Sequence, residues 1–199
     1  MKQTPFTPRR WTRAEYDLLV EQGVFEDEPL ELLGGQLLVA EPKGPYHATG
    51  VGKVTDGIRA ALPPGWVVRV QLSIALDDES EPEPDIAVVA GTHDDYLDDH
   101  PARPVLVVEV AHSSLRFDRS RKGSAYARAG LSDYWIVNLV DRLVEVYREP
   151  VPDPAARYGW RYGSMQTFGP GDVVVPLALP SASVAVSDLL PRSADKGGT

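Results

Sequence analysis

The carboxylate of Glu109 lies inside an apolar run, PVLVVEVA, directly between Val108 and Val110. Such a run predicts a buried strand, where an ionised carboxylate is costly unless a cation or a hydrogen-bond donor compensates it. A second acid, Asp85, opens another apolar run, PDIAVVA, and Lys122 follows in a predicted helix. Two carboxylates at strand positions with a nearby lysine are the groups that a metal-dependent site for phosphodiester cleavage needs.

The two carboxylates suit a Mg²⁺ ion, which prefers oxygen ligands and keeps several waters, so that one or two protein carboxylates suffice. In this interpretation Lys122 orients or activates the attacking water and stabilises charge on the phosphate. Each acid also has a purely structural interpretation. Asp85 follows Pro84, and aspartate is common in turns beside proline. Glu109 can instead form a buried ion pair with a nearby arginine.

Length and composition limit the class of protein. A chain of 199 residues is long enough for one domain with a sizeable core, which we expect over residues 1–190, followed by a disordered tail at 191–199. No apolar run approaches the length of a membrane span, and the N-terminus lacks the apolar core of a signal peptide. The absence of cysteine suits a reducing compartment. We therefore expect a cytoplasmic protein without a membrane partner.

Charge is unevenly distributed along the chain. The formal net charge of −9 argues against non-specific binding of nucleic acid. The acids concentrate between Asp77 and Asp99, whereas the segment 112–128 is rich in bases. Within that segment Arg116, Arg119 and Arg121 are candidates for phosphate contacts. The alternative for each arginine is an ordinary solvated charge on a helix or loop.

Hydrophobic periodicity and turn signals predict the elements that position these groups. They are a short helix after Thr12, a hairpin over 31–39, a helix over 47–62, a half-buried strand over 66–76, central strands over 86–90 and 105–110, a helix over 118–129, a hairpin over 134–147, and short edge strands over 158–162 and 172–176. This pattern predicts one α/β or α+β domain.

Two long stretches, EPDIAVV and PVLVVEVAHSSLRFDRSRKGSAYARAGLSDYWIVNL, resemble the Uma-type restriction endonuclease family of the PD-(D/E)XK nuclease superfamily. The segment EYDLLVEQGVFEDEPLELLGGQLLV is similar to that family's opening helix and hairpin, so the resemblance covers most of residues 12–147. The resemblance implies a restriction-endonuclease-like core, with a mixed central β-sheet flanked by helices. It also implies a metal-dependent endonuclease that uses Mg²⁺ or Mn²⁺ to hydrolyse DNA.

The resemblance assigns roles to individual residues. Asp85 and Glu109 are the metal-binding carboxylates, and Lys122 is the motif lysine. The superfamily pattern has its lysine two residues after the second acid, but this chain has Ala111 there. In the Uma-type family the lysine has moved to the following helix, where Tyr126 lies one turn away on the same face.

The resemblance also suggests that Glu31 and His47 line the pocket, with Glu31 as an additional metal ligand. His47 is in helical register with the apolar residues of the 47–62 helix and is therefore expected to point inward. A surface strand acid and a satisfied core histidine are equally consistent with these two positions.

Two functions of different classes remain open at this point. The first is a nuclease, for which a homodimer with two sites would explain cleavage of both DNA strands. The second is a non-catalytic protein on a nuclease scaffold that binds nucleic acid or another protein. The acidic net charge and the displaced lysine favour the second function, whereas the combination of Asp85, Glu109 and Lys122 favours the first.

Overall fold

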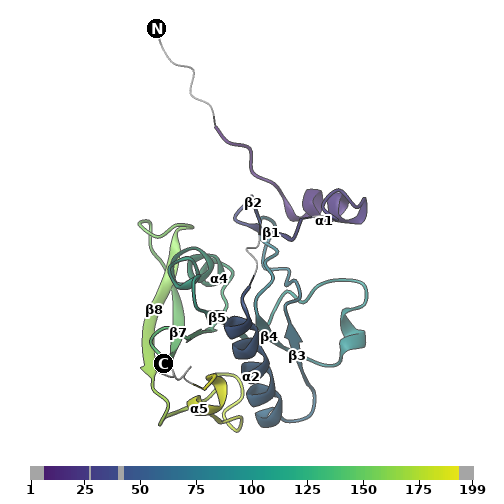
Figure 1. Cartoon of the computed structure of the whole chain (residues 1–199). Helices are drawn as coiled ribbons and strands as arrows, with labels where there is room; N and C mark the ends of the chain where they lie inside the picture. Colours follow the sequence, from purple (N-terminus) through teal and green to yellow (C-terminus); the bar gives the residue numbers. More distant parts are fainter. Residues whose placement is uncertain (1–6, 27, 40–42, 193–199) are drawn as a thin grey trace, which may run out of the picture.

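A mixed six-stranded sheet forms the centre of the computed structural model, which describes residues 7–26, 28–39 and 43–192 (Figure 1). The strand order is β3-β4-β5-β6-β7-β8, and only β5 and β6 run parallel to each other. The strands are β3 (Trp66–Val70), β4 (Ile86–Ala90), β5 (Leu106–Ala111), β6 (Asp133–Asn138), β7 (Leu143–Pro152) and β8 (Trp160–Phe168). The chain thus has the mixed α+β architecture that the sequence predicts.

Helices and two small hairpins surround the sheet. They are α1 (Arg13–Glu21), the hairpin of β1 (Leu30–Leu33) and β2 (Gln36–Val39), α2 (Pro45–Ala61), η1 (His93–Tyr96), α3 (Leu115–Phe117), the π-helical turn η2 (Asp118–Lys122), α4 (Gly123–Arg128), β9 (Val173–Val174), β10 (Val184–Ala185) and α5 (Val186–Leu189). Helices α2 and α5 cover one face of the sheet, while α4 packs against the other (Figure 1). In the described part of the chain, no helix combines the length and the apolarity that crossing a membrane requires.

Alternation along β5 divides the core into two layers. Val108 and Val110 pack in the cluster beneath α2 and α5, whereas Val107 and Ala111 pack in the cluster beneath α4. Because successive strand residues point to opposite faces, Glu109 shares the α4 face with Val107 and Ala111. The apolar run that surrounds Glu109 is therefore explained by a strand that is buried on both faces.

Several predicted elements are confirmed. The hairpin turns at Gly34 and Gly35, which both have positive φ, as a two-residue turn between these strands requires. The central strands and the 134–147 hairpin also form as predicted. Helix α2 begins at Pro45, two residues before the predicted start, because proline is favoured in the first helical turn.

Three predictions about boundaries were wrong. The strand predicted over 66–76 ends at Val70, because Gln71 has a φ of +50°, which is incompatible with a continuing strand. The helix predicted over 118–129 is interrupted by the π-helical turn η2. The predicted edge strand over 158–162 is the longer β8, whereas β9 pairs with β10 outside the main sheet. Most of the predicted tail, 193–199, lies outside the described residues.

Helix α2 approaches the sheet most closely at Gly50. A Cβ atom at this position would lie 2.8 Å from Cγ1 of Val110 and 3.1 Å from Cδ1 of Leu139. Gly52, on the same helix, has no heavy atom within 4 Å of its would-be Cβ. The two glycines therefore separate the effect of crowding against the sheet from the effect of helix propensity.

We expect Gly50→Ala to be less stable than Gly52→Ala by about 1–3 kcal/mol, the usual cost of inserting a methyl group into a packed core. Both changes replace a helical glycine with alanine and gain similar propensity, so the difference isolates the packing against Val110 and Leu139. Urea denaturation of the two variants measures it. Equal free energies of unfolding would show that α2 does not pack closely at Gly50.

Candidate functional site

Asp85 and Glu109 meet on adjacent strands. The antiparallel pairing of β4 and β5 sets Ile86 opposite Val108, and one further step of the same register sets Asp85 opposite Glu109. Both acids are almost completely buried, with 2% and 3% of their surface exposed. The backbone N–H of Val110 donates to Oδ2 of Asp85 at 2.8 Å, which fixes the first carboxylate to the strand that carries the second.

The helical segment formed by η2 and α4 supplies the groups that compensate the buried carboxylate of Glu109. Lys122 Nζ donates to Oε1 of Glu109 at 2.9 Å, and the hydroxyl of Tyr126 donates to the same oxygen at 2.7 Å. Lys122 and Tyr126 are four residues apart and thus lie on one helical face, as predicted. In the described part of the chain, no hydrogen bond ends on Oε2 of Glu109.

Glu31 and His47 join the same cluster. Lys122 Nζ lies 3.5 Å from Oε2 of Glu31, which also accepts the backbone N–H of Glu83 at 3.1 Å. His47 Nε2 lies 3.1 Å from Oδ2 of Asp85 and acts as the donor, since an ionised carboxylate only accepts. Strand β1 and the first turn of α2 thus bring in the two pocket candidates that the family resemblance suggested.

The structure adds three polar residues that the sequence analysis did not assign to the site. Lys43 Nζ donates to Oδ1 of Asp85 at 2.6 Å, and Nε2 of Gln71 donates to the same oxygen at 3.3 Å. Asp118 is buried one helical turn before Lys122 and accepts the hydroxyl of Ser114 at 2.6 Å. Only Asp118 has a sequence signal, the four-residue spacing to Lys122, whereas Lys43 and Gln71 reach Asp85 through tertiary contacts.

Burial and neighbouring charge act differently on the two central acids. Burial raises the pKa of Glu109 to about 8, with Lys122 opposing that shift and the nearby charges of Asp85 and Asp118 adding to it. Burial also acts to raise the pKa of Asp85, but the bonds from His47 and Lys43 outweigh it and hold the pKa well below its usual range. Asp85 is therefore held in its ionised form, whereas ionisation of Glu109 depends on the charge of Lys122.

Lys122 and Asp118 respond to the same surroundings. Burial would lower the pKa of Lys122, but the carboxylates of Glu109, Glu31 and Asp118 outweigh burial and raise this pKa well above its ordinary value. Burial raises the pKa of Asp118 to about 6, although Lys122 opposes the shift. The cluster therefore contains a lysine that stays charged and acids whose ionisation is costly.

The three arginine candidates differ in their surroundings. Arg119 makes a bidentate ion pair with Glu145 of β7, at 2.5 and 2.9 Å, and Glu145 is 1% exposed. Arg121 lies over the ring of Phe117, with 6.0 Å from its guanidinium carbon to the ring centroid. Arg116 is exposed to solvent. Arg119 is thus tied to the sheet by its ion pair, whereas Arg116 is exposed.

The donor chemistry of the cluster fits a hard divalent cation, because Glu31, Asp85 and Glu109 supply carboxylate oxygens. Oε2 of Glu109 and Oε1 of Glu31 accept no hydrogen bond from the described residues and thus keep lone pairs for a ligand. The carboxylates are neutralised by Lys43 and Lys122, and no three metal-ligating side chains within residues 7–26, 28–39 and 43–192 converge as an ion would require. A cation at Oδ1 of Asp85 would therefore meet Lys43, and a cation at Oε1 of Glu109 would meet Lys122.

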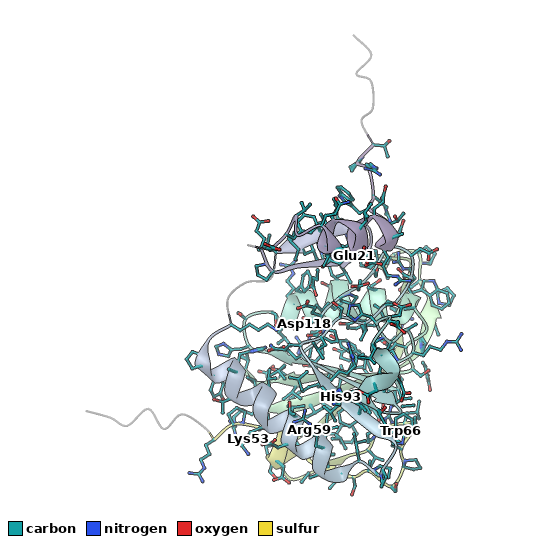
Figure 2. All side chains as sticks on the ribbon, turned by 90° about the vertical axis from the view of Figure 1, so that its right-hand side faces the viewer. Glu21, Lys53, Arg59, Trp66, His93 and Asp118 are labelled. Atoms are coloured by element: carbon teal, nitrogen blue, oxygen red, sulfur yellow. The ribbon has the colours of Figure 1, made fainter. Side chains whose placement is uncertain are left out.

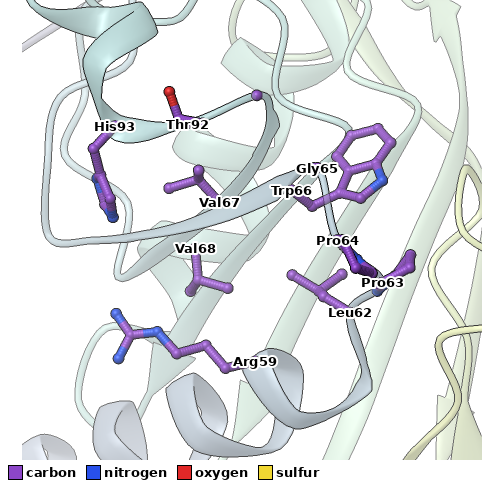
Figure 3. Close-up of a pocket in the computed structure, with 11 residues that line it drawn as sticks. Arg59, Leu62, Pro63, Pro64, Gly65, Trp66, Val67, Val68, Thr92 and His93 are labelled. Carbon is purple, nitrogen blue, oxygen red and sulfur yellow. The ribbon is translucent and has the colours of Figure 1, made fainter.

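A surface groove of about 610 Å³ lies away from this cluster. It is lined by the end of α2, the start of β3 and the residues that follow β4, including Arg59, Trp66 and His93 (Figure 3). Figure 2 shows Asp118 in the middle of the molecule, apart from these three residues. The buried carboxylates and the groove are thus separate features.

Comparison with solved structures supports the fold. The crystal structure of a putative nuclease belonging to DUF820 from Anabaena variabilis ATCC 29413 matches this chain with a TM-score of 0.60 and 17% sequence identity. The match covers 80% of this chain and 88% of that one. At this identity the likeness establishes a shared fold. A comparison with curated proteins gives no match.

Comparison with protein families supports the resemblance seen in the sequence. The model of the Uma2 family, whose description is "Putative restriction endonuclease", matches residues 13–187. This range includes both central acids, Lys122 and the elements that carry them. Because the match spans most of its length, the chain belongs to the Uma2 family of putative restriction endonucleases.

Proposed function

We propose that this protein is a divalent-metal-dependent endonuclease that hydrolyses phosphodiester bonds in DNA. The observation that carries the proposal is the cross-strand pair of Asp85 and Glu109, with the Lys122 ammonium 2.9 Å from Glu109. Membership of the Uma2 family supports a nuclease, and the cluster supplies the groups that phosphodiester hydrolysis needs.

The cation, Mg²⁺ or Mn²⁺, would be held by Asp85 and Glu109, with Glu31 as a further ligand. When bound, it supplies Lewis acidity, which lowers the pKa of the attacking water and stabilises charge on the phosphate. Tyr126 and His47 are positioning residues, because each bonds to one of the two carboxylates and limits its rotation.

Lys122 contributes a fixed positive charge. Its raised pKa keeps the ammonium protonated at neutral pH, so it is unsuited to act as a general base. A buried ammonium beside the scissile phosphate stabilises the negative charge that develops in the transition state. We therefore assign Lys122 to electrostatic stabilisation.

Substrate contacts and assembly follow the same proposal. Arg116 and Arg121 are the candidate phosphate contacts, whereas Arg119 anchors the helical segment through Glu145. We propose a homodimer, since two sites account for cleavage of two strands, and a cytoplasmic location, which suits a chain without cysteine. Residues 1–190 would form one nuclease-like domain.

Nicking of supercoiled plasmid DNA tests the proposed activity directly. With Mg²⁺ or Mn²⁺ we expect nicking that EDTA abolishes and that Asp85→Asn and Glu109→Gln reduce below detection. Lys122→Ala is expected to lower the rate by about 10²–10³-fold, the usual effect of removing one electrostatic stabiliser.

Glu21→Gln is the matched control, because Glu21 is an exposed acid at the end of α1 (Figure 2). This variant should cut at the wild-type rate. Wild-type activity in Glu109→Gln would exclude the proposed metal ligands. If the wild-type protein cuts neither duplex DNA, single-stranded DNA nor RNA, a non-catalytic binding protein on this scaffold becomes the better account.

The pH dependence of stability tests the proposed charge balance. Burial raises the pKa of Asp118 from 3.8 to about 6, so the folded chain holds this proton more tightly than the unfolded chain. The contribution of Asp118 to the free energy of unfolding must therefore fall as the pH rises from about 4 to about 6. The neutral amide in Asp118→Asn mimics the protonated acid, so this variant loses no stability at this position over the same range.

We expect the free energy of unfolding of Asp118→Asn, relative to wild type, to increase between pH 4 and pH 8 by on the order of 1–3 kcal/mol. Urea denaturation of both proteins at the two pH values measures this change. A difference that is independent of pH would show that ionisation of Asp118 is not costly in the folded protein.

A further inference from the structure

The two oxygens of Asp85 are held in different ways. Oδ2 accepts from the backbone N–H of Val110 and from His47, whose side chain is only 11% exposed. Oδ1 accepts from Lys43 and Gln71, which are both exposed side chains. Oδ2 is thus fixed by the sheet and α2, whereas Oδ1 is covered by groups that can move into solvent.

These four donors use the full capacity of the carboxylate, which offers about four lone-pair sites. A cation that ligates Asp85 must therefore displace one of the four. Removing the N–H of Val110 would leave a backbone donor without a partner inside the sheet, which is costly. Displacing Lys43 costs less than that, because 39% of its side-chain surface is exposed and its ammonium is hydrated when released.

The surroundings of Asp85 are negatively charged, which affects how a phosphate backbone can approach. Glu109 and Asp118 lie near enough to Asp85 for its charge to raise their pKa values, and Glu31 likewise raises the pKa of the neighbouring acid Glu83. A nucleic-acid backbone approaching Asp85 therefore needs a local cation to offset repulsion by these acids. Lys43 is such a cation, because its ammonium lies beside Asp85 at the end of a flexible side chain.

We propose that Lys43 and a divalent cation compete for Oδ1 of Asp85, and that the displaced Lys43 binds a phosphate of the nucleic-acid substrate. The inference rests on the proposed nuclease function. Cation and substrate binding are then mutually favourable, because both require the bond between Lys43 and Asp85 to be broken. A cation on Oδ1 releases Lys43 for the phosphate, and a phosphate on Lys43 leaves Oδ1 free for the cation. Lys43 thereby couples loading of the cation to the presence of substrate.

The first test measures Mn²⁺ binding to the protein alone, by electron paramagnetic resonance of the free ion. Lys43→Met is expected to bind Mn²⁺ about tenfold more tightly than wild type, since it removes a charged hydrogen bond from the ligand oxygen. The matched control is Gln71→Met, which removes the neutral donor from the same oxygen. This control should stay within about threefold of wild type, because a neutral hydrogen bond is worth less.

The second test measures binding of a fluorescent duplex oligonucleotide in EDTA, as a function of salt concentration. Lys43→Met should bind more weakly, with a plot of log affinity against log salt that is less steep by about 0.9, the loss of one phosphate contact. Gln71→Met should keep the wild-type slope. In Mn²⁺ without EDTA, an uncleavable oligonucleotide should tighten Mn²⁺ binding in wild type but not in Lys43→Met.

The outcomes separate the inference from the function on which it rests. Suppose that Glu109→Gln weakens Mn²⁺ binding and that Lys43→Met does not tighten it. This result would overturn the role of Lys43 and keep the nuclease assignment. Mn²⁺ binding that is unaffected by Glu109→Gln would overturn the proposed metal site itself. If Lys43→Met binds no Mn²⁺ or has the wild-type salt slope, the inference is wrong.

Discussion

Glu109 places a carboxylate in the middle of a β-sheet that is buried on both faces, and much of the structure around it compensates for this charge. The chain cannot satisfy the carboxylate from the sheet alone, because its strand neighbours are aliphatic. The two bonds to Oε1 come from Lys122 and Tyr126, on the helical segment that covers this face. That segment must therefore be held in one place, or the buried charge would lose its partners at a large cost in stability.

Contacts from the sheet hold this segment. The hydroxyl of Tyr134 in β6 donates to the carbonyl of Asp118, where the helix widens into a π-helical turn. Glu145 in β7 binds Arg119 through both of its oxygens and also accepts from Asn138 and Tyr147. A π-helical turn often marks a functional position, and here it ends at Lys122. The sheet thus carries Glu109 and also fixes the element that neutralises it.

Much of this arrangement is visible in the sequence. The aliphatic runs around Asp85 and Glu109 predict central strands, and the four-residue spacing of Lys122 and Tyr126 predicts that both face the same way. The resemblance to the Uma-type family, now supported over residues 13–187, predicted a mixed sheet with flanking helices. These features depend on local patterns, which a sequence records directly.

Other features depend on contacts between distant segments. Lys43 and Gln71 converge on one oxygen of Asp85 although nothing in their spacing links them to it. Arg119 binds Glu145, which lies in a later strand, and nothing in the spacing of the two residues predicts this pair. The end of β3 at Val70 depends on the positive φ of Gln71, although the Gln71 N–H still donates to the carbonyl of Asp85. The periodicity of residues 66–76 contains no sign of that turn.

Joint binding of a divalent cation by Asp85 and Glu109 is the step on which the proposed function depends. Anomalous diffraction from crystals soaked in Mn²⁺ measures this most directly. We expect a single strong peak between the two carboxylates, with their oxygens about 2.0–2.6 Å from it and Lys43 moved away from Asp85. The joint metal site would be contradicted if no peak appeared between the carboxylates at saturating Mn²⁺. Asp85 would then still bond to Lys43, and Glu109 to Lys122.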